Sequence, residues 1–203
     1  MKKQISPKAG LSTIVNHYGE GDNALGAHVT PIYQTSTFSF PDVETMQAIF
    51  AGQQPGYIYS RSANPNVTQL GDKYAYLEGL DLLRQRPDAK PSEVVAGKAV
   101  SSGMAAISAA VLTRVSAGET VITQRDLYGN AFSFWHEFAP RLGIKVVWTE
   151  GNSAEAWEAA FHAHPEAVLA YTETPANPTM SVVDLALLGE VAHTSGAWVM
   201  VDN

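Results

Sequence analysis

The stretch GETVITQRDLYGNAFSFWHEFAPRLGIKVVWTE, residues 118–150, decides the fold class of this chain. A short run rich in β-branched residues at 119–123 is followed by a helix-length amphipathic stretch at 128–142 and a second such run at 144–149. Two apolar strands joined through a helix are typical of a right-handed crossover between parallel strands. The stretch therefore predicts one unit of a parallel sheet.

The same alternation extends in both directions along the chain. Further apolar runs lie at 94–101, 167–172 and 197–202, and further helix-length stretches lie at 103–116, 153–163 and 182–195. Five strands that alternate with helices predict an α/β domain whose mostly parallel sheet is covered on both faces.

Residues 1–60 differ from the rest, because glycines and prolines interrupt them repeatedly. A short helix is expected at 42–50 with Asp42 as its cap. Such a segment has too little periodic apolar surface for a core of its own, so we expect an N-terminal arm at 1–60 and a second domain at 61–203. That domain should open with a helix from Asn64 to about Leu83, followed by an exposed polar loop at 84–93. The buried face of this helix is predicted to comprise Val67, Leu70, Tyr74 and Leu77.

Composition excludes several classes of protein. The 203 residues carry a net charge of −7, which argues against nucleic-acid binding. The absence of cysteine excludes disulfides and thiolate sites, and no apolar run has the roughly 18 residues of a membrane span. The N-terminus has no apolar stretch behind its basic start, so we expect a cytoplasmic protein. Charged residues make up only 16%, against about 25% in an average domain, so much of the surface is expected to face other protein.

Ligands in open parallel sheets collect where strands lead into helices, and two such places come early in the domain. Ser102, Gly103 and Met104 open an alanine-rich helix, whose free N–H groups suit a phosphate. The alternative is a plain serine cap. Tyr128 opens the helix after the next strand, where it could stack on a flat ring or simply pack against its neighbours.

Two further strand ends carry polar groups. Asn177 lies in Glu173-Thr-Pro-Ala-Asn-Pro178, where two prolines could hold its side chain toward a site or simply form a turn. Asp202 ends an apolar strand, and a carboxylate there is costly unless a partner such as a protonated ring nitrogen pairs with it; a structural cap is the alternative. Taken together, the four features describe a pocket for pyridoxal 5'-phosphate (PLP), whose ring nitrogen needs an acid.

These residues resemble the Cys/Met-metabolism (trans-sulfuration) family of PLP-dependent enzymes, a family of lyases and transferases of methionine and cysteine metabolism. The resemblance covers nearly the whole chain. Its motifs include Pro31-Ile-Tyr-Gln-Thr-Ser-Thr-Phe38, Tyr59-Ser-Arg61, Ser102-Gly-Met104, Leu127-Tyr-Gly129, Pro175-Ala-Asn-Pro178 and Val201-Asp-Asn203. It implies a fold-type I large domain and γ-elimination or γ-replacement on sulfur-containing or O-acylated homoserine-type L-amino acids. It also implies a homotetramer built as a dimer of dimers.

The resemblance also implies a role for each matching residue. Ser102, Gly103 and Met104 correspond to the phosphate loop, in which the backbone N–H groups of the last two hold the phosphate. Tyr128 corresponds to the ring-stacking tyrosine, which also moves protons near the leaving group. Asn177 corresponds to the residue near the ring's phenolic oxygen, and Asp202 to the acid on the ring nitrogen. Tyr59 and Arg61 correspond to a pair that grips the phosphate of the neighbouring subunit, consistent with an inter-subunit arm.

One departure from the family pattern limits these expectations. The family's Schiff-base lysine follows the strand-end acid by roughly two dozen residues, and none of the seven lysines here lies in a matching motif. We therefore expect a chain that stops before that lysine and the C-terminal domain, and the rival hypothesis is an inactive fragment that acts only in subunit packing. A dinucleotide-dependent reductase lacks its glycine fingerprint here. No metal site is expected, since His162 and His164 lack a third ligand in the sequence.

Overall fold

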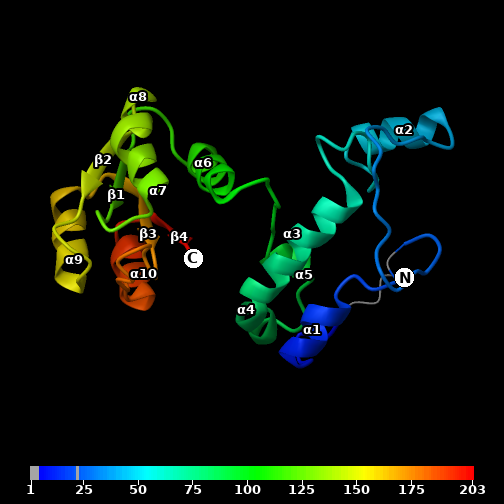
Figure 1. Cartoon of the computed structure of the whole chain (residues 1–203), viewed down its shortest axis with the longest axis horizontal. Helices are drawn as coiled ribbons and strands as arrows, with labels where there is room; N and C mark the ends of the chain where they lie inside the picture. Colours follow the sequence, from blue (N-terminus) through cyan, green and yellow to red (C-terminus); the bar gives the residue numbers. More distant parts are fainter. Residues whose placement is uncertain (1–4, 22) are drawn as a thin grey trace. The chain divides into compact units, whose positions relative to one another are not determined.

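The computed structural model describes residues 5–21 and 23–203, and the chain forms two compact units, Met1–Val100 and Ser101–Asn203. The second unit contains a sheet of four parallel strands in the order β2-β1-β3-β4 (Figure 1). The strands are β1 (Thr120–Thr123), β2 (Lys145–Trp148), β3 (Ala167–Glu173) and β4 (Trp198–Asp202). The α/β class and the parallel sheet are confirmed.

Six helical segments accompany these strands. They are α6 (Gly103–Arg114), α7 (Gly129–Ser133), a π-helical turn η1 (Phe134–Phe138), α8 (Ala139–Arg141), α9 (Ala154–Ala163) and α10 (Leu185–Thr194). Ser102, Ser153 and Asp184 each accept a backbone N–H from the first turn of α6, α9 and α10, respectively. The predicted helix 128–142 is confirmed as a continuous helical run, with the π turn in its middle.

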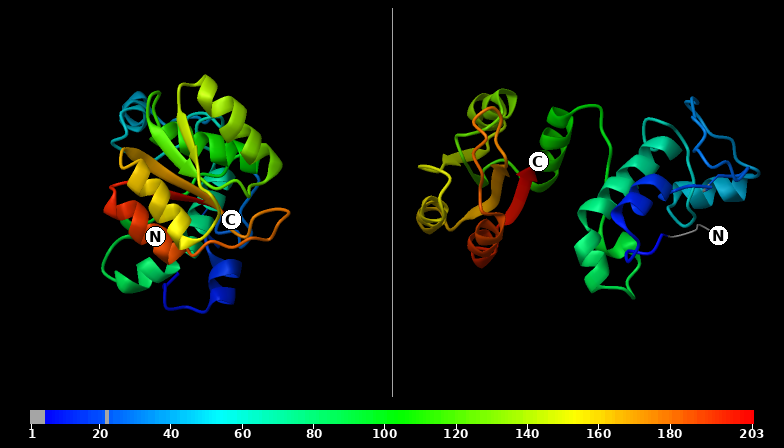
Figure 2. Two further views of the ribbon diagram at one scale, coloured as in Figure 1. Left: turned by 90° about the vertical axis from the view of Figure 1, so that its left-hand side faces the viewer. Right: turned by 60° about the horizontal axis from the view of Figure 1, so that its bottom comes forward.

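Two hydrophobic clusters cover the two faces of the sheet, because successive strand residues point to opposite sides. Val121 and Leu169 pack with residues of α6, α7 and η1, whereas Ile122 and Ala170 pack with residues of α9 and α10. Figures 1 and 2 show α9 and α10 on one side of the sheet and α7 on the other. Trp135 and Trp157 are the largest buried side chains of the respective clusters.

The predicted strand at 94–101 is wrong. Val94 ends a short helix, α5 (Pro91–Val94), and the described residues that follow it form no ladder. Their backbone packs against a helix instead, since a Cβ atom on Gly71 would lie 2.8 Å from the carbonyl oxygen of Gly97. An apolar, β-branched run becomes a strand only where a neighbour takes up its backbone hydrogen bonds.

The first unit contains α1 (Leu11–His17), α2 (Val43–Phe50), α3 (Pro65–Glu78), α4 (Leu80–Gln85) and α5. The caps predicted at Asp42 and Asn64 are confirmed by their side-chain hydrogen bonds. The helix expected from Asn64 to Leu83 is present but breaks at Gly79 into α3 and α4. The unit boundary follows Val100, so residues 61–100 fold with the first 60; an arm that reaches another subunit stays a prediction.

The predicted buried face of α3 is wrong as well. Val67, Leu70 and Tyr74 are exposed, and Leu77 is half-buried. The buried side of α3 and α4 instead carries Gly71 and the cluster residues Tyr76, Leu80 and Leu83, which pack with Ile14 of α1. The side of α3 that carries small residues is the buried one, because Gly71 and Ala75 let the backbone around Gly97 approach closely.

Two asparagines fix the extended segment at residues 31–38 to the start of α3. Asn64 Nδ2 donates to the carbonyl oxygen of Tyr33 at 2.9 Å, and Asn66 Nδ2 donates to that of Pro31 at 2.9 Å. Asn66 Oδ1 also accepts the N–H of Tyr33 at 2.8 Å. A bridge between Thr37 and Tyr59 then joins this segment to the chain just before α3.

The close approach of Gly97 to α3 can be tested by substitution. Gly97→Ala should lower the free energy of unfolding by about 1–3 kcal/mol, because the new methyl group would collide with the backbone carbonyl of Gly71. Chemical denaturation measures this loss. Gly189→Ala is the control, since its Cβ meets nothing within 4 Å and alanine favours the interior of α10. Equal stability of Gly97→Ala and the wild type would contradict the packing.

Candidate functional site

The parallel strands β1, β3 and β4 bring their carboxyl ends to the same edge of the sheet. Strand register places Thr123 beside Tyr171 and Glu173 beside Asp202. β1 and β3 are neighbours, yet the chain leaves β1 toward β2 and leaves β3 toward β4 on the opposite side. Open α/β sheets bind their ligands outside the strand ends at such a switch point. This edge is therefore the candidate site.

A fully buried amide, Gln124, ties the ends of β1 and β3 together. Its Nε2 atom donates to the carbonyl oxygens of Glu173 at 2.9 Å and Asp126 at 2.8 Å. Its Oε1 atom accepts the hydroxyl hydrogen of Thr172. Because both the nitrogen and the oxygen of this amide are hydrogen-bonded, the ends of β1 and β3 are held at fixed positions relative to each other.

A buried carboxylate, Glu173, then connects the two loops that leave these strands. Its side chain lies at the end of β3, and the residue is only 5% exposed. Oε2 accepts the backbone N–H of Tyr128 at 2.6 Å, and Oε1 accepts the backbone N–H of Asn177 at 2.8 Å. One side chain thus positions two of the residues that the sequence predicts in the site.

The side chains of Tyr128 and Asn177 themselves remain accessible. Tyr128 directly precedes α7 and is 42% exposed, and its phenolic oxygen accepts a hydrogen bond from Asn130 Nδ2 at 3.1 Å. Asn177 is exposed in the loop after β3. An aromatic ring at this edge that is not enclosed by the core is free to stack on a planar ligand.

Asp202 ends β4, the outer strand of the sheet, and is half-buried. The fully buried Tyr171 donates its hydroxyl hydrogen to Asp202 Oδ2 at 3.2 Å. Burial, reinforced by the Asp202 carboxylate, raises the pKa of Tyr171 above its ordinary value. Tyr171 therefore stays protonated and continues to donate to the carboxylate.

The first turn of α6 carries the predicted phosphate loop. Ser102 Oγ accepts the N–H of Ala105 at 3.1 Å, so this serine is a cap. The N–H groups of Gly103 and Met104 lie in the first turn, where the helix itself offers no acceptor. A Cβ atom on Gly103 would meet nothing within 4 Å, so this backbone is open. Among the hydrogen bonds of residues 5–21 and 23–203, none joins this turn to Asp202 or Asn177.

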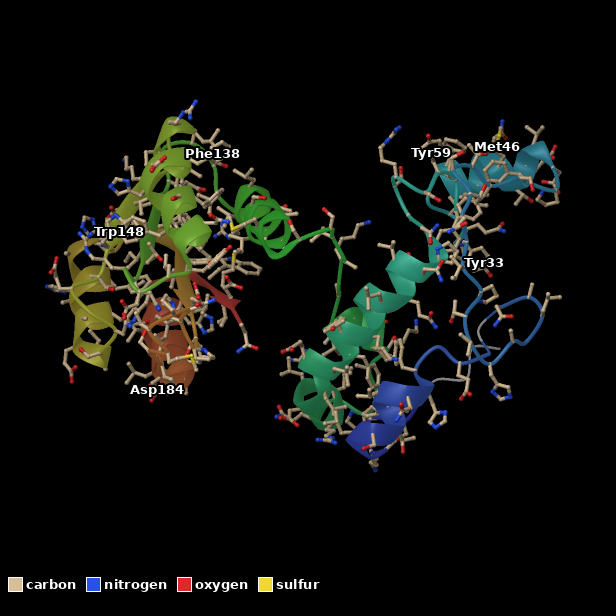
Figure 3. The ribbon with its side chains drawn as sticks, in the orientation of Figure 1. Tyr33, Met46, Tyr59, Phe138, Trp148 and Asp184 are labelled. Carbon is tan, nitrogen blue, oxygen red and sulfur yellow. The ribbon has the colours of Figure 1, made fainter. Side chains whose placement is uncertain are left out.

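Tyr59 and Arg61 lie together in the first unit, where Figure 3 labels Tyr59 near α2. The Arg61 guanidinium carbon is 4.7 Å from the centre of the Tyr59 ring. Tyr59 is half-buried and bridged to Thr37, whereas Arg61 is exposed. The structure thus brings these two residues together in one unit, and the other predicted site residues belong to the second unit.

Sequence reasoning missed three supporting residues, Gln124, Tyr171 and Glu173. The signal for Glu173 was present, since it ends an apolar strand and a carboxylate there is as costly as the one on Asp202. Tyr171 and Gln124 gave no comparable signal, because their partners on neighbouring strands lie 31 and 48–49 residues away in the sequence. Their roles depend on strand order, which the sequence pattern does not specify.

Comparison with known proteins identifies the family. The family model described as Cys/Met metabolism PLP-dependent enzyme matches residues 12–203. This chain belongs to that family. An L-methionine gamma-lyase from Porphyromonas gingivalis is 40% identical over all of this chain and 47% of its own length. An O-succinylhomoserine sulfhydrylase from Pseudomonas aeruginosa is 33% identical over 96% of the chain and 44% of its own length.

Solved structures agree with this assignment. A cystathionine gamma synthase from Xanthomonas oryzae pv. oryzae, solved with cystathionine, has a TM-score of 0.76 and 26% identity, and the match covers 96% of this chain and 44% of that one. The fold also matches an O-acetylhomoserine (thiol)-lyase from Campylobacter jejuni with a TM-score of 0.81 and 23% identity, over 98% of this chain and 44% of that protein. The latter structure contains N'-pyridoxyl-lysine-5'-monophosphate. The chain spans less than half the length of these relatives, and the fold-type I assignment is confirmed.

The residues at the sheet edge and those at the start of α6 each fit a part of PLP, the cofactor of this family. The open backbone at Gly103 and the N–H groups of the first turn of α6 suit a phosphate. The carboxylate of Asp202 suits a protonated ring nitrogen, and the exposed ring of Tyr128 suits a planar heterocycle. Within the described ranges, no group of three or more His, Asp or Glu side chains is placed to hold a metal, and no helix could span a membrane.

The hydrogen bond from Tyr171 to Asp202 makes a prediction about stability and pH. Tyr171→Phe should lower the free energy of unfolding by about 1–3 kcal/mol at neutral pH, because it removes a donor to a charged acceptor. The raised pKa of Tyr171 favours the folded state fully below about pH 10, where an unfolded tyrosine is also protonated. Above that pH the unfolded state ionises first, so the advantage of the wild type should shrink.

Denaturation curves from pH 7 to pH 11 measure this difference. Tyr74→Phe is the matched control, since Tyr74 is 62% exposed and should contribute little. A difference between wild type and Tyr171→Phe that grows above pH 10 would contradict the assignment.

Proposed function

We propose that this chain supplies the cofactor-binding part of a PLP-dependent enzyme of methionine and cysteine metabolism. Its reaction is γ-elimination or γ-replacement on an L-amino acid such as a homoserine ester, cystathionine or methionine. The observation that carries the proposal is the Asp202 carboxylate, held by Tyr171 at the same sheet edge as the exposed Tyr128 ring. The relatives named methionine gamma-lyase and O-succinylhomoserine sulfhydrylase support the reaction class.

Each site residue has a distinct task in this proposal. When bound, PLP supplies an electron sink that stores charge while the substrate loses protons and its γ-substituent leaves. The N–H groups of Gly103 and Met104 bind the phosphate beside the cap Ser102, and Asp202 holds the proton on the ring nitrogen. Asn177 contacts the phenolic oxygen of the ring. Tyr128 stacks on the ring, and its phenol moves a proton near the leaving group.

The proposal includes a second copy of the chain. The Arg61 guanidinium packs over the Tyr59 ring and is exposed. An arginine in this position can bind a phosphate through two parallel hydrogen bonds. We assign this pair to the phosphate of a neighbouring subunit, within a homotetramer built as a dimer of dimers. A soluble, cytoplasmic enzyme is part of the same proposal.

The second candidate is an inactive chain that acts only in subunit packing. It is favoured by the position of the lysines. Lys145 is the single lysine of Ser101–Asn203, and it begins β2, at the amino edge of the parallel sheet. Lys98 donates to the carbonyl oxygen of Ser62 in the first unit. The carboxyl edge therefore lacks a lysine of its own unit, and we propose that residues 1–203 alone are inactive.

Binding of PLP tests the role of Asp202. Asp202→Asn should weaken PLP binding by about tenfold or more, because a neutral amide does not neutralise a protonated ring nitrogen. An absorbance titration with PLP measures the affinity. Glu150→Gln is the matched control, since it removes one exposed negative charge just beyond β2. Equal affinities of Asp202→Asn and the wild type would overturn the proposed site.

Chemical trapping tests the proposal about the lysines. Incubation of the chain with PLP and borohydride, followed by mass measurement of peptides, should find no single lysine labelled in full. The physical reason is that no lysine of the second unit lies at the carboxyl edge. Complete labelling at one lysine, such as Lys98, would contradict this expectation and would favour an active chain.

A further inference from the structure

None of the roles proposed for the site residues explains the position of Glu173. Its carboxylate is buried at the end of β3, yet it has no ion-pair partner among the described residues. A buried charge costs several kcal/mol unless hydrogen bonds compensate for it. Both of its oxygens accept backbone N–H groups, one from Tyr128 and one from Asn177. The compensation therefore comes from the two loops that carry the predicted site residues.

The backbone of Glu173 is itself fixed from both sides. Gln124 Nε2 donates to its carbonyl oxygen, and its register partner on β4 is Asp202. The next residue, Thr174, donates its N–H to the carbonyl oxygen of Asp202 at 3.1 Å. Because this backbone is constrained, the Glu173 side chain has a defined direction. Its two oxygens therefore fix the positions of the Tyr128 and Asn177 N–H groups.

We propose that Glu173 is a positioning residue for cofactor binding, which holds the loops of Tyr128 and Asn177 in their binding arrangement before PLP arrives. This inference rests on the proposed function, because Tyr128 and Asn177 are assigned there to the cofactor ring. A preformed site binds more tightly than one whose loops must first be ordered. Glu173 acts only through these two backbone N–H groups.

Two substitutions at this position separate the two hydrogen bonds. Glutamine keeps one acceptor oxygen but replaces the other with an NH₂ donor, which cannot bond a backbone N–H. Glu173→Gln should therefore release one of the two N–H groups, and Glu173→Ala should release both. Amide hydrogen exchange, followed residue by residue without cofactor, should show about tenfold faster exchange at each released position.

Reference positions distinguish local release from general unfolding. The N–H groups of Leu169 and Ala170, in the buried part of β3, should exchange as in the wild type. Glu150→Gln, the exposed control, should leave Tyr128 and Asn177 unchanged. Loss of protection at Leu169 in Glu173→Ala would mean that this variant unfolds more widely, and the test then rests on Glu173→Gln. Wild-type exchange at both Tyr128 and Asn177 in Glu173→Gln would overturn the proposal.

The cofactor measurement completes the test. A titration with PLP should show about tenfold weaker binding by Glu173→Gln than by Glu150→Gln, if their thermal unfolding midpoints agree. Release of a loop N–H with undiminished PLP affinity would overturn the positioning role. If the wild type itself fails to bind PLP, the proposed function fails, whereas the exchange result still reports on the hydrogen bonds of Glu173. The two failures are thereby distinguishable.

Discussion

The carboxyl edge of the sheet depends on one buried polar connection between β1 and β3. Gln124 joins the strand ends through backbone carbonyls, and Glu173 joins the loops that follow through backbone N–H groups. An unpaired amide or carboxylate in this position would cost several kcal/mol, so the two side chains are stable only when all their partners are in place. The folded edge is thus the arrangement that satisfies both, and it presents Tyr128 and Asn177 to solvent.

Much of the fold follows from local pattern, because four of the predicted strands and the helices between them have the expected spacing. The strand expected at 94–101 shows the limit of such reasoning. Its residues have strand character, but a strand also needs a neighbour, and here Gly97 packs on Gly71. Similarly, the apolar side of α3 is periodic, yet the buried side is the one whose small residues permit close approach.

The candidate site was predictable only in part. Tyr128, Asn177 and Asp202 lie where a polar residue follows an apolar strand, and the sequence shows that directly. Their supports, Tyr171 and Gln124, act across neighbouring strands, so they depend on the order β2-β1-β3-β4. The low charge content of 16% predicts that much of the surface contacts other protein. This stays a prediction, and the exposed Leu70 and Tyr74 are consistent with it.

The proposed function depends on PLP binding at this sheet edge with its ring nitrogen on Asp202. The most direct measurement is an experimental structure of the protein with PLP added. The proposed site predicts a distance of about 2.7–2.9 Å between the ring nitrogen and a carboxylate oxygen of Asp202. It also predicts that the ring of Tyr128 is stacked on the cofactor. A bound PLP whose ring nitrogen faces any other group, or solvent, would contradict it.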